Sequence, residues 1–246
     1  MSNEFLHPRR RTGRYAALTA AGLAALTGIA YVVASAMSGT HASAGSPSPR
    51  TNPVATVSAP SSVAPSSSGG SSAPVALTRG SQLVNGVSVG YPHTLAGAVS
   101  AASEYMADLG STLDPDRTAA VMRLVADPSY TDGPAEWAKG TSDARASLGL
   151  PTSGLLPSAA AVMLGPAEYQ VRDASDDEVT VLLLARYTIS LPGTGTKSSN
   201  AVFPLRMHWA GGDWKVLKPD GTTYTSLAAA PGSDQASSLG WQELGQ

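Results

Sequence analysis

Hydrophobic positions follow a helical period in three successive segments in the middle of the chain. Apolar residues at 95–109 recur every three or four positions, with Thr94 as an N-cap before them and Gly110 as a stop after them. The same period continues at 114–126, which opens with an Asp cap followed by a Pro, and at 134–148, which ends before a Gly. These patterns predict three consecutive helices.

Beyond residue 166 the period of the apolar positions changes to two, which is typical of strands. We predict a short strand at 167–173, a long strand at 178–191, a Gly/Ser/Thr-rich loop at 192–200, and two further strands at 202–210 and 214–217. The predicted inward side chains are Val179, Val181, Leu183, Ala185, Tyr187 and Ile189, followed by Phe203, Leu205, Met207 and Trp209. Helices followed by strands indicate an α+β fold.

Two apolar features of the strands bear on packing. The dipeptide Gly211-Gly212 predicts a two-residue hairpin turn that pairs Trp209 with Trp214. On the outer side of the long strand, Leu182 and Leu184 are apolar as well. Two interpretations fit these leucines: the helices or the C-terminal tail cover them, or they form an exposed patch for a partner or a second copy.

The N-terminal region has the pattern of an export signal. Four arginines, Arg9, Arg10, Arg11 and Arg14, precede 23 uncharged residues at 15–37. A helix of that length crosses the roughly 30 Å hydrocarbon layer, and the arginines hold its N-terminal end in the cytoplasm. We therefore predict a signal anchor in contact with membrane lipid and a C-terminal domain outside the cell. Small residues that end at Ala36 or Ala44 also fit a signal-peptidase site, so a cleaved signal peptide and a secreted domain remain the alternative.

Differences in composition divide the chain into segments. Residues 1–14 form a basic cytoplasmic N-terminus, and 38–80, dominated by Ser, Pro, Ala and Gly, are predicted to be a disordered linker. Residues 81–225 contain the predicted helices and strands, and 226–246 are predicted to be a flexible tail. Residues 81–246 carry ten Lys and Arg against 17 acids, which argues against nucleic-acid binding by this part. The absence of Cys excludes disulfides and thiolate sites.

Several segments resemble those of exported nuclear transport factor 2-like domains. They are Tyr91-Pro92-His93-Thr94 with Gly97-Ala98-Val99, the helices, the long strand, and Trp209 with Gly211-Gly212-Asp213-Trp214-Lys215-Val216. The whole layout resembles more closely a family of uncharacterised bacterial single-span membrane proteins. It is also similar to the bitopic assembly factors of type IV secretion and conjugation machines. The resemblance implies a cystatin-like cone, with about three helices packed on a curved antiparallel sheet of about four strands.

Candidate chemistry in the predicted domain is sparse. His93 precedes the first helix and His208 lies on a strand, and neither belongs to a metal-binding or catalytic motif. The acidic residues at 173–178 lack the spacing of a calcium-binding loop, and no nucleotide-binding motif is present. We therefore predict no catalytic residue, metal site or cofactor. The residues that we expect to line a pocket or an interface are His93, Tyr105, Tyr187, Trp209, Trp214, Leu182 and Leu184.

These observations favour a non-enzymatic, single-span membrane protein that presents an extracytoplasmic scaffold or interaction domain. The expected partners are other envelope proteins or a second copy of the chain, and the resemblance suggests a conjugation or secretion assembly. The alternative is a secreted or anchored protein that uses the pocket of the cone for a small ligand or for catalysis. The polarity of that pocket distinguishes the two. A cell-envelope protein with a functional tether is a third interpretation.

Overall fold

The computed structural model describes residues 75–245, which form an α+β fold. The elements are β1 (Gln82–Val84), β2 (Val87–Val89), α2 (Leu95–Gly110), α3 (Pro115–Val125), α4 (Gly133–Ser147), β3 (Ala161–Arg172), β4 (Glu178–Leu191), β5 (Gly195–Ala210), β6 (Asp213–Val216), the 3-10 helix η1 (Thr225–Leu227), α5 (Asp234–Ser238) and β7 (Gln242–Glu243). The predicted span at 15–37 and most of the predicted linker lie outside the described residues. Within 75–245, no helix is long and apolar enough to cross a membrane.

The three predicted helices are confirmed, with ends close to those expected. The hydroxyl of Thr94 accepts a hydrogen bond from the Gly97 N–H (3.0 Å) and so caps α2. Asp114 caps α3 in the same way through the Asp116 N–H, and Pro115 follows in the first turn. The capping residues therefore fix where these helices begin.

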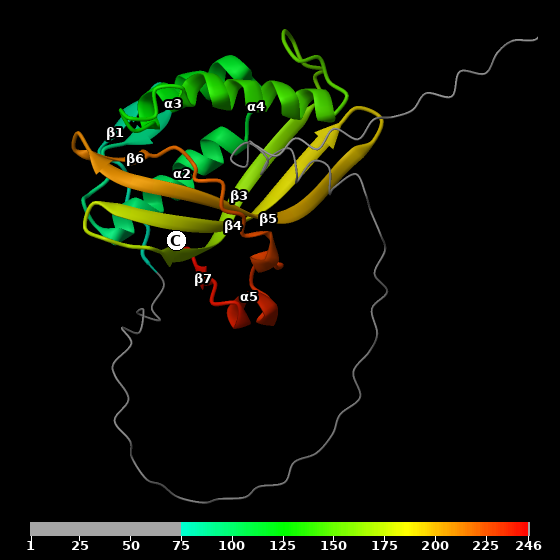
Figure 1. Cartoon of the computed structure of the whole chain (residues 1–246). Helices are drawn as coiled ribbons and strands as arrows, with labels where there is room; N and C mark the ends of the chain where they lie inside the picture. The colour runs from blue at the N-terminus through cyan, green and yellow to red at the C-terminus, as the bar shows by residue number, and fades with distance from the viewer. Residues whose placement is uncertain (1–74, 246) are drawn as a thin grey trace, which may run out of the picture.

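The main sheet is antiparallel, with the strand order β6-β5-β4-β3-β7 (Figure 1). Strands β3 to β6 follow one another as hairpins, whereas β7 comes from the end of the described chain and pairs with β3 through two residue pairs. The predicted turn at Gly211 and Gly212 is confirmed, because both residues have positive φ and Trp209 pairs with Trp214. Strand β4 has the predicted bounds.

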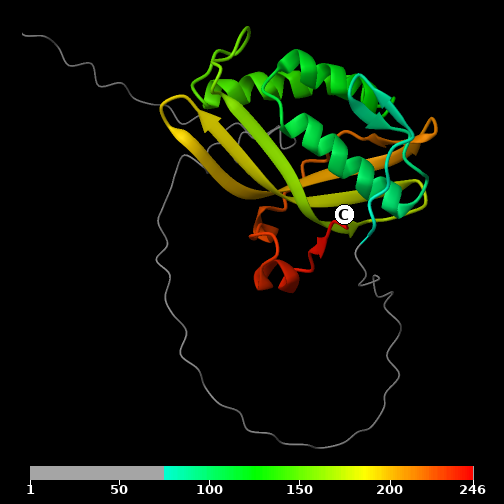
Figure 2. The ribbon, with the colours of Figure 1, turned by 180° about the vertical axis from the view of Figure 1, so that it is seen from behind.

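The sheet separates two layers of unequal size. Helices α2, α3 and α4 cover one face, and residues 222–245, which we call the C-terminal segment, cover part of the other face (Figures 1 and 2). The predicted inward positions of β4, together with Phe203, Leu205 and Met207 of β5, belong to the core cluster on the helix side. Trp209 is only partly buried at the margin of this cluster.

Two strands are longer than predicted. Strand β3 begins at Ala161 rather than at 167, and β5 begins at Gly195, inside the segment predicted to be a loop. In β3 the residues Gly165 and Pro166 interrupt the apolar pattern, and a bulge between Pro166 and Glu168 accommodates them. The first residues of β5 are polar because that part of the hairpin is exposed to water, so no hydrophobic alternation marks it.

The prediction of a flexible tail at 226–246 is wrong for the described part of the tail. The C-terminal segment forms η1, α5 and β7, and Trp241 is buried in it. Together with Ala229 and Ala236, Trp241 covers Leu182 and Leu184, which are fully buried. Of the two interpretations of these leucines, burial under the tail is therefore correct. Apolar burial by one Trp and several small side chains orders a segment whose composition indicates a coil.

The end of the predicted linker also contacts the domain. The Val75 N–H donates to the Tyr169 hydroxyl (3.3 Å), and the Thr78 N–H donates to the Ser100 hydroxyl on α2 (2.8 Å). Ala76 forms an isolated parallel bridge with Gly245. The domain therefore begins at or before Val75, not at residue 81, because side chains of α2 and β3 supply hydrogen bonds that the composition of the linker does not indicate.

Candidate functional site at the β5–β6 hairpin

Asp213, the first residue of β6, is a buried carboxylate at the centre of a polar network. One carboxylate oxygen accepts from the Tyr91 N–H (2.9 Å) and the Trp214 N–H (2.9 Å). The other accepts from the Tyr105 hydroxyl (3.0 Å) and pairs with the ammonium of Lys215 (3.1 Å). The sequence did not indicate this role for Asp213. An acidic residue beside a two-Gly turn is usually a turn residue. The one feature that could have indicated a different role is that Asp213 is an acid between the two tryptophans of the hairpin.

The two tyrosines at this network are held in the neutral form. Burial raises the pKa of Tyr105 far above its ordinary value, and the charge of Asp213 raises it further. Burial likewise raises the pKa of Tyr91 to about 12. The ring of Tyr91 meets that of Tyr105 edge to face, with centroids 5.8 Å apart. Near neutral pH both phenols therefore stay protonated; the Tyr105 hydroxyl donates to Asp213, and the Tyr91 ring packs against that of Tyr105.

Above this network, His93 lies flat on Trp209. The two rings are nearly parallel, at 6°, with centroids 4.3 Å apart, and Trp209 in turn meets Trp214 edge to face at 5.6 Å. The Nε2 of His93 lies 2.9 Å from both Oδ1 of Asp177 and the carbonyl oxygen of Asp176. Because both neighbours are acceptors, Nε2 carries the proton. The loop before α2, the β3–β4 turn and the β5–β6 hairpin thus meet at one half-exposed aromatic stack.

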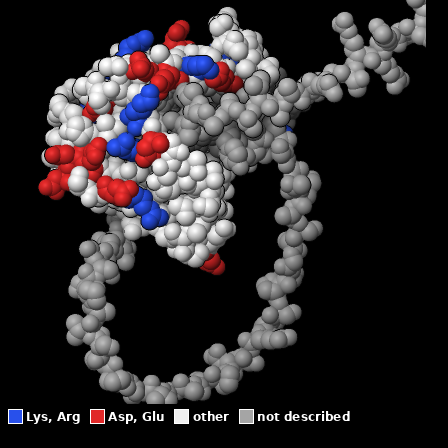
Figure 3. Space-filling view, in the orientation of Figure 1, with Lys and Arg blue, Asp and Glu red and all other residues white. Residues whose placement is uncertain are grey.

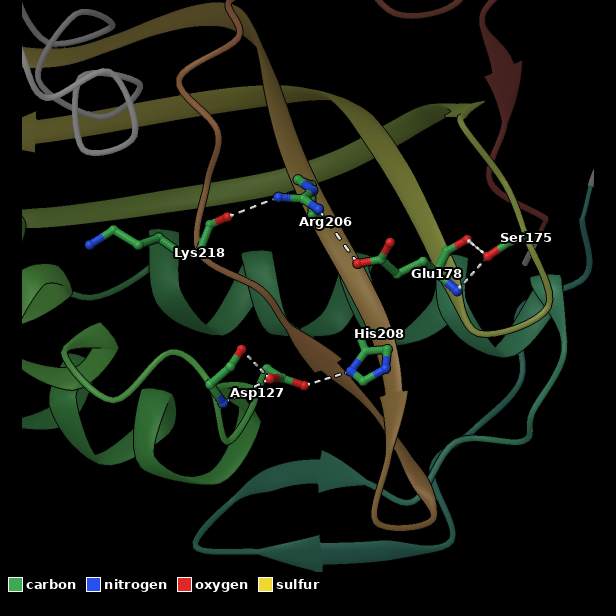
Figure 4. A network of polar contacts seen from close by, with 7 residues as sticks. Asp127, Ser175, Glu178, Arg206, His208 and Lys218 are labelled. Atoms are coloured by element: carbon green, nitrogen blue, oxygen red, sulfur yellow. Dashed lines mark hydrogen bonds and ion pairs between the residues drawn. The ribbon is translucent and has the colours of Figure 1, made fainter.

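His208, the residue before Trp209, makes a second histidine–aspartate pair (Figure 4). Its Nδ1 donates to Oδ2 of the buried Asp127 at 2.7 Å. The other oxygen of Asp127 accepts from both the N–H and the hydroxyl of Ser129. Burial alone would raise the pKa of Asp127, but the hydrogen bonds from His208 and Ser129 outweigh it and leave that pKa below its ordinary value.

A set of exposed ion pairs extends this region across the sheet. Arg206 approaches both Glu178 and the carbonyl of Lys218, each at 3.5 Å (Figure 4). Lys218 pairs with Glu136 at 2.7 Å. Acidic side chains gather at the end of the molecule that contains the β3–β4 turn, whereas the surface over α5 carries almost no charge (Figure 3). The β5–β6 end is therefore the polar, charged end of the domain.

The His208–Asp127 pair can be compared with the histidine–aspartate pairs of nucleophilic enzymes. An Asp–His pair activates a nucleophile only when the second ring nitrogen reaches one, and within residues 75–245 no hydrogen bond joins Nε2 of His208 to a hydroxyl group. In the same part of the chain, no group of three or more His, Asp and Glu side chains is placed to hold a metal ion.

The structure brings some of the predicted site residues together and separates others. His93, Trp209, Trp214 and Tyr105 converge at the β5–β6 hairpin. Tyr187 lies elsewhere, buried in the core at mid-β4, where burial raises its pKa to about 12. Leu182 and Leu184 lie on the opposite face under the C-terminal segment.

One family model matches the chain, over residues 30–240, and it is described as a domain of unknown function, DUF8175. The chain belongs to the DUF8175 family. No curated protein and no solved structure gave a significant match. The DUF8175 match includes the three helices, the hairpin with Asp213, and α5, so the β5–β6 end lies within the family's domain.

Proposed function

We propose that this chain is a non-enzymatic, single-span membrane protein that presents its DUF8175 domain outside the cell as an interaction module. The four arginines before the uncharged segment at 15–37 support the membrane anchor and its orientation. The helices packed on one face of an antiparallel sheet support the finer proposal of a nuclear transport factor 2-like cone. A conjugation or secretion assembly is the concrete setting that the layout suggests.

The observation that carries this proposal is the filled interior of the domain. Tyr105 and Tyr187, two residues expected to line a pocket, are at most 1% exposed, and Trp214 is buried beside them in the same core cluster. A small-ligand site needs a concave, partly apolar cavity with converging polar groups. The carboxylate oxygens of Asp213 instead accept hydrogen bonds from groups of the domain itself. This favours recognition by the outer surface over binding in the interior.

Parts of the sheet edges are also occupied. At β6, the Asp127 N–H donates to the Val216 carbonyl (2.8 Å), so the loop after α3 covers this edge. At β3, the Leu164 N–H donates to the Ser111 hydroxyl (3.0 Å), and Pro166 has no N–H to offer. Blocked edges prevent a partner from adding a strand there. A partner is therefore expected to use side chains, and the stack of His93 and Trp209 with its acidic neighbours is the surface that we assign to it.

Site-specific photo-crosslinking in cells that make the full-length protein tests this assignment. A photoreactive residue at Asp176, which is exposed beside His93, is expected to give a defined adduct with an envelope protein. Leu155 is the matched control, because it is 96% exposed and precedes β3 at the opposite end of the sheet. If position 176 gives no adduct beyond those of position 155, the β5–β6 end is not the interaction surface.

A further inference from the structure

Glu168 is a buried carboxylate whose partners are incomplete. It follows the bulge in β3, and only 5% of its surface is exposed. Oε1 accepts from the Gly232 N–H at 2.7 Å, whereas Oε2 is enclosed and has no hydrogen-bond partner among residues 75–245. An ionised oxygen without a partner is costly to bury, because desolvation is not compensated. The protein atoms described around this oxygen therefore provide neither a hydrogen-bond donor nor a positive charge for it.

The surroundings of Glu168 are apolar on one side and acidic on the other. In the ladder with β4 it pairs with Leu184, which belongs to the apolar cluster under Trp241. In the ladder with β7 it pairs directly with Glu243. Directly paired residues of antiparallel strands share one face, with Cβ atoms about 4.5–5.5 Å apart, and like charges in such a pair destabilise the ladder.

Within the described residues, no basic side chain forms an ion pair with Glu168 or Glu243, and the ion pairs formed there join other residues. Arg186 lies two residues along β4 from Leu184, but it is exposed and forms none of those ion pairs. Two acidic residues are therefore directly paired at the end of the C-terminal segment, and neither has an ion-pair partner among residues 75–245.

We propose that Glu168 and Glu243 form a weak binding site for a divalent cation, Ca²⁺ in preference to Mg²⁺. Carboxylate oxygens are the ligands of hard cations, and Ca²⁺ tolerates irregular geometry, whereas Mg²⁺ demands a near-ideal octahedron. Two carboxylates, completed by water and main-chain oxygens, correspond to a dissociation constant of about 10⁻⁴–10⁻³ M. A bound cation fixes β7 to β3 beside the Gly232 loop and so holds the C-terminal segment over Leu182 and Leu184. This inference does not depend on the proposed function.

Calorimetric titration of the chelator-treated full-length protein with CaCl₂ tests the site. We expect one site with a dissociation constant of about 10⁻⁴–10⁻³ M and at least tenfold weaker binding in both Glu168→Gln and Glu243→Gln. Asp234→Asn is the matched control, because Asp234 is an exposed acid of the same segment, and its binding should equal that of the wild type. Glu243 is exposed, so its variant is expected to fold even if the Glu168 variant does not.

Thermal unfolding gives an independent measurement. At 10 mM CaCl₂ the Tm of the wild type should rise by about 3–10 °C, with a smaller rise in MgCl₂ and a smaller rise in Glu243→Gln. Wild-type binding that persists in both Gln variants would overturn the proposal, because the cation would then lie elsewhere. An absence of Ca²⁺ binding by the wild type at millimolar concentrations would also overturn it.

Discussion

His93 and Trp209 stack with their ring centroids 4.3 Å apart, although one precedes the first helix of the domain and the other ends a strand of its sheet. The stack rests on Trp214, whose indole N–H donates to the Pro92 carbonyl at 2.9 Å. The segment before α2 is thus held to the β5–β6 hairpin by one exposed contact and one buried contact. The two contacts differ in what they contribute to stability and to recognition.

Trp214→Ala is expected to lower the free energy of unfolding by about 3–5 kcal/mol, because it removes a buried indole and leaves a cavity. His93→Ala should cost less than about 1 kcal/mol, because its ring is 41% exposed. Urea unfolding followed by far-UV circular dichroism measures both, with Leu155→Ala as the exposed control. An equal loss of unfolding free energy in the two variants would contradict the distinction between Trp214 as a buried support and His93 as part of the exposed surface.

Asp213 provides the second prediction. Asp213→Ala removes the acceptor of two N–H groups and of the Tyr105 hydroxyl and the counter-charge of Lys215, whose ammonium keeps only the Leu124 carbonyl, and we expect a loss of about 3–5 kcal/mol. Tyr105→Phe removes one donor to the same carboxylate and should cost about 1.5–3 kcal/mol. Denaturant titration of both variants tests the order. A Tyr105→Phe variant that loses more than Asp213→Ala would show that Asp213 is not the centre of the network.

The sequence predicts those parts of the fold that depend on local chemistry. Caps such as Thr94 and Asp114 mark the helices, and the alternation along β4 marks the longest buried strand. The polar start of β5 and the interrupted start of β3 carry no such signal, because long-range pairing with β4 forms them. Whether those residues form a strand depends on their tertiary contacts rather than on their intrinsic β propensity.

The candidate site was predictable only in its aromatic part. Trp209 and Trp214 follow from the hairpin turn, and His93 was a candidate from its position before α2. The pairing of His208 with Asp127 was not predictable, because the loop after α3 approaches β5 only once the helices pack on the sheet. The burial of Glu168 was not predictable either. It depends on the C-terminal segment, which folds over β3 although its many small residues do not indicate this.

The pH dependence of stability follows from Asp127. Because its pKa lies below the ordinary 3.8 in the folded chain, its contribution is present above that value and is lost as the pH falls through the folded pKa. We therefore expect Asp127→Asn to be less stable than the wild type by about 1–3 kcal/mol at pH 7, with the difference shrinking below pH 4.

Urea midpoints between pH 7 and pH 3 measure this difference. Ser129→Ala is the graded control, because it removes a single hydrogen bond to Asp127 and leaves that of His208 in place. Its loss of stability should be smaller than that of Asp127→Asn and should shrink over the same range of pH. A difference between wild type and Asp127→Asn that stays constant down to pH 3 would contradict the downward shift of the pKa.

Trp241 tests the role of the C-terminal segment. Trp241→Ala removes the large side chain of the cluster that covers Leu182 and Leu184, so the segment should detach while the helices and main strands stay folded. Increased fluorescence of a hydrophobic dye, with nearly unchanged far-UV circular dichroism, is the expected result. Removing a hydroxyl elsewhere in the segment, as in Ser226→Ala, should leave dye binding unchanged. A cooperative loss of all structure would show instead that the segment belongs to the main core.

The absence of cysteine gives a clean test of orientation at the membrane. Single cysteines at Asn3 and at Leu155 introduce one thiol each, before the predicted span and on the exposed surface of the domain. If Arg9, Arg10, Arg11 and Arg14 hold the N-terminus inside, a membrane-impermeant maleimide should label Leu155→Cys in intact cells. It should label Asn3→Cys only after the membrane is permeabilised.

The same two variants separate the anchor from a cleaved signal. An uncleaved anchor keeps both thiols in the membrane fraction, whereas cleavage after Ala36 or Ala44 removes the thiol at position 3 and releases a labelled domain into the medium. The reverse labelling, at position 3 from outside and at 155 only after permeabilisation, would invert the topology. In that case the DUF8175 domain would face the cytoplasm.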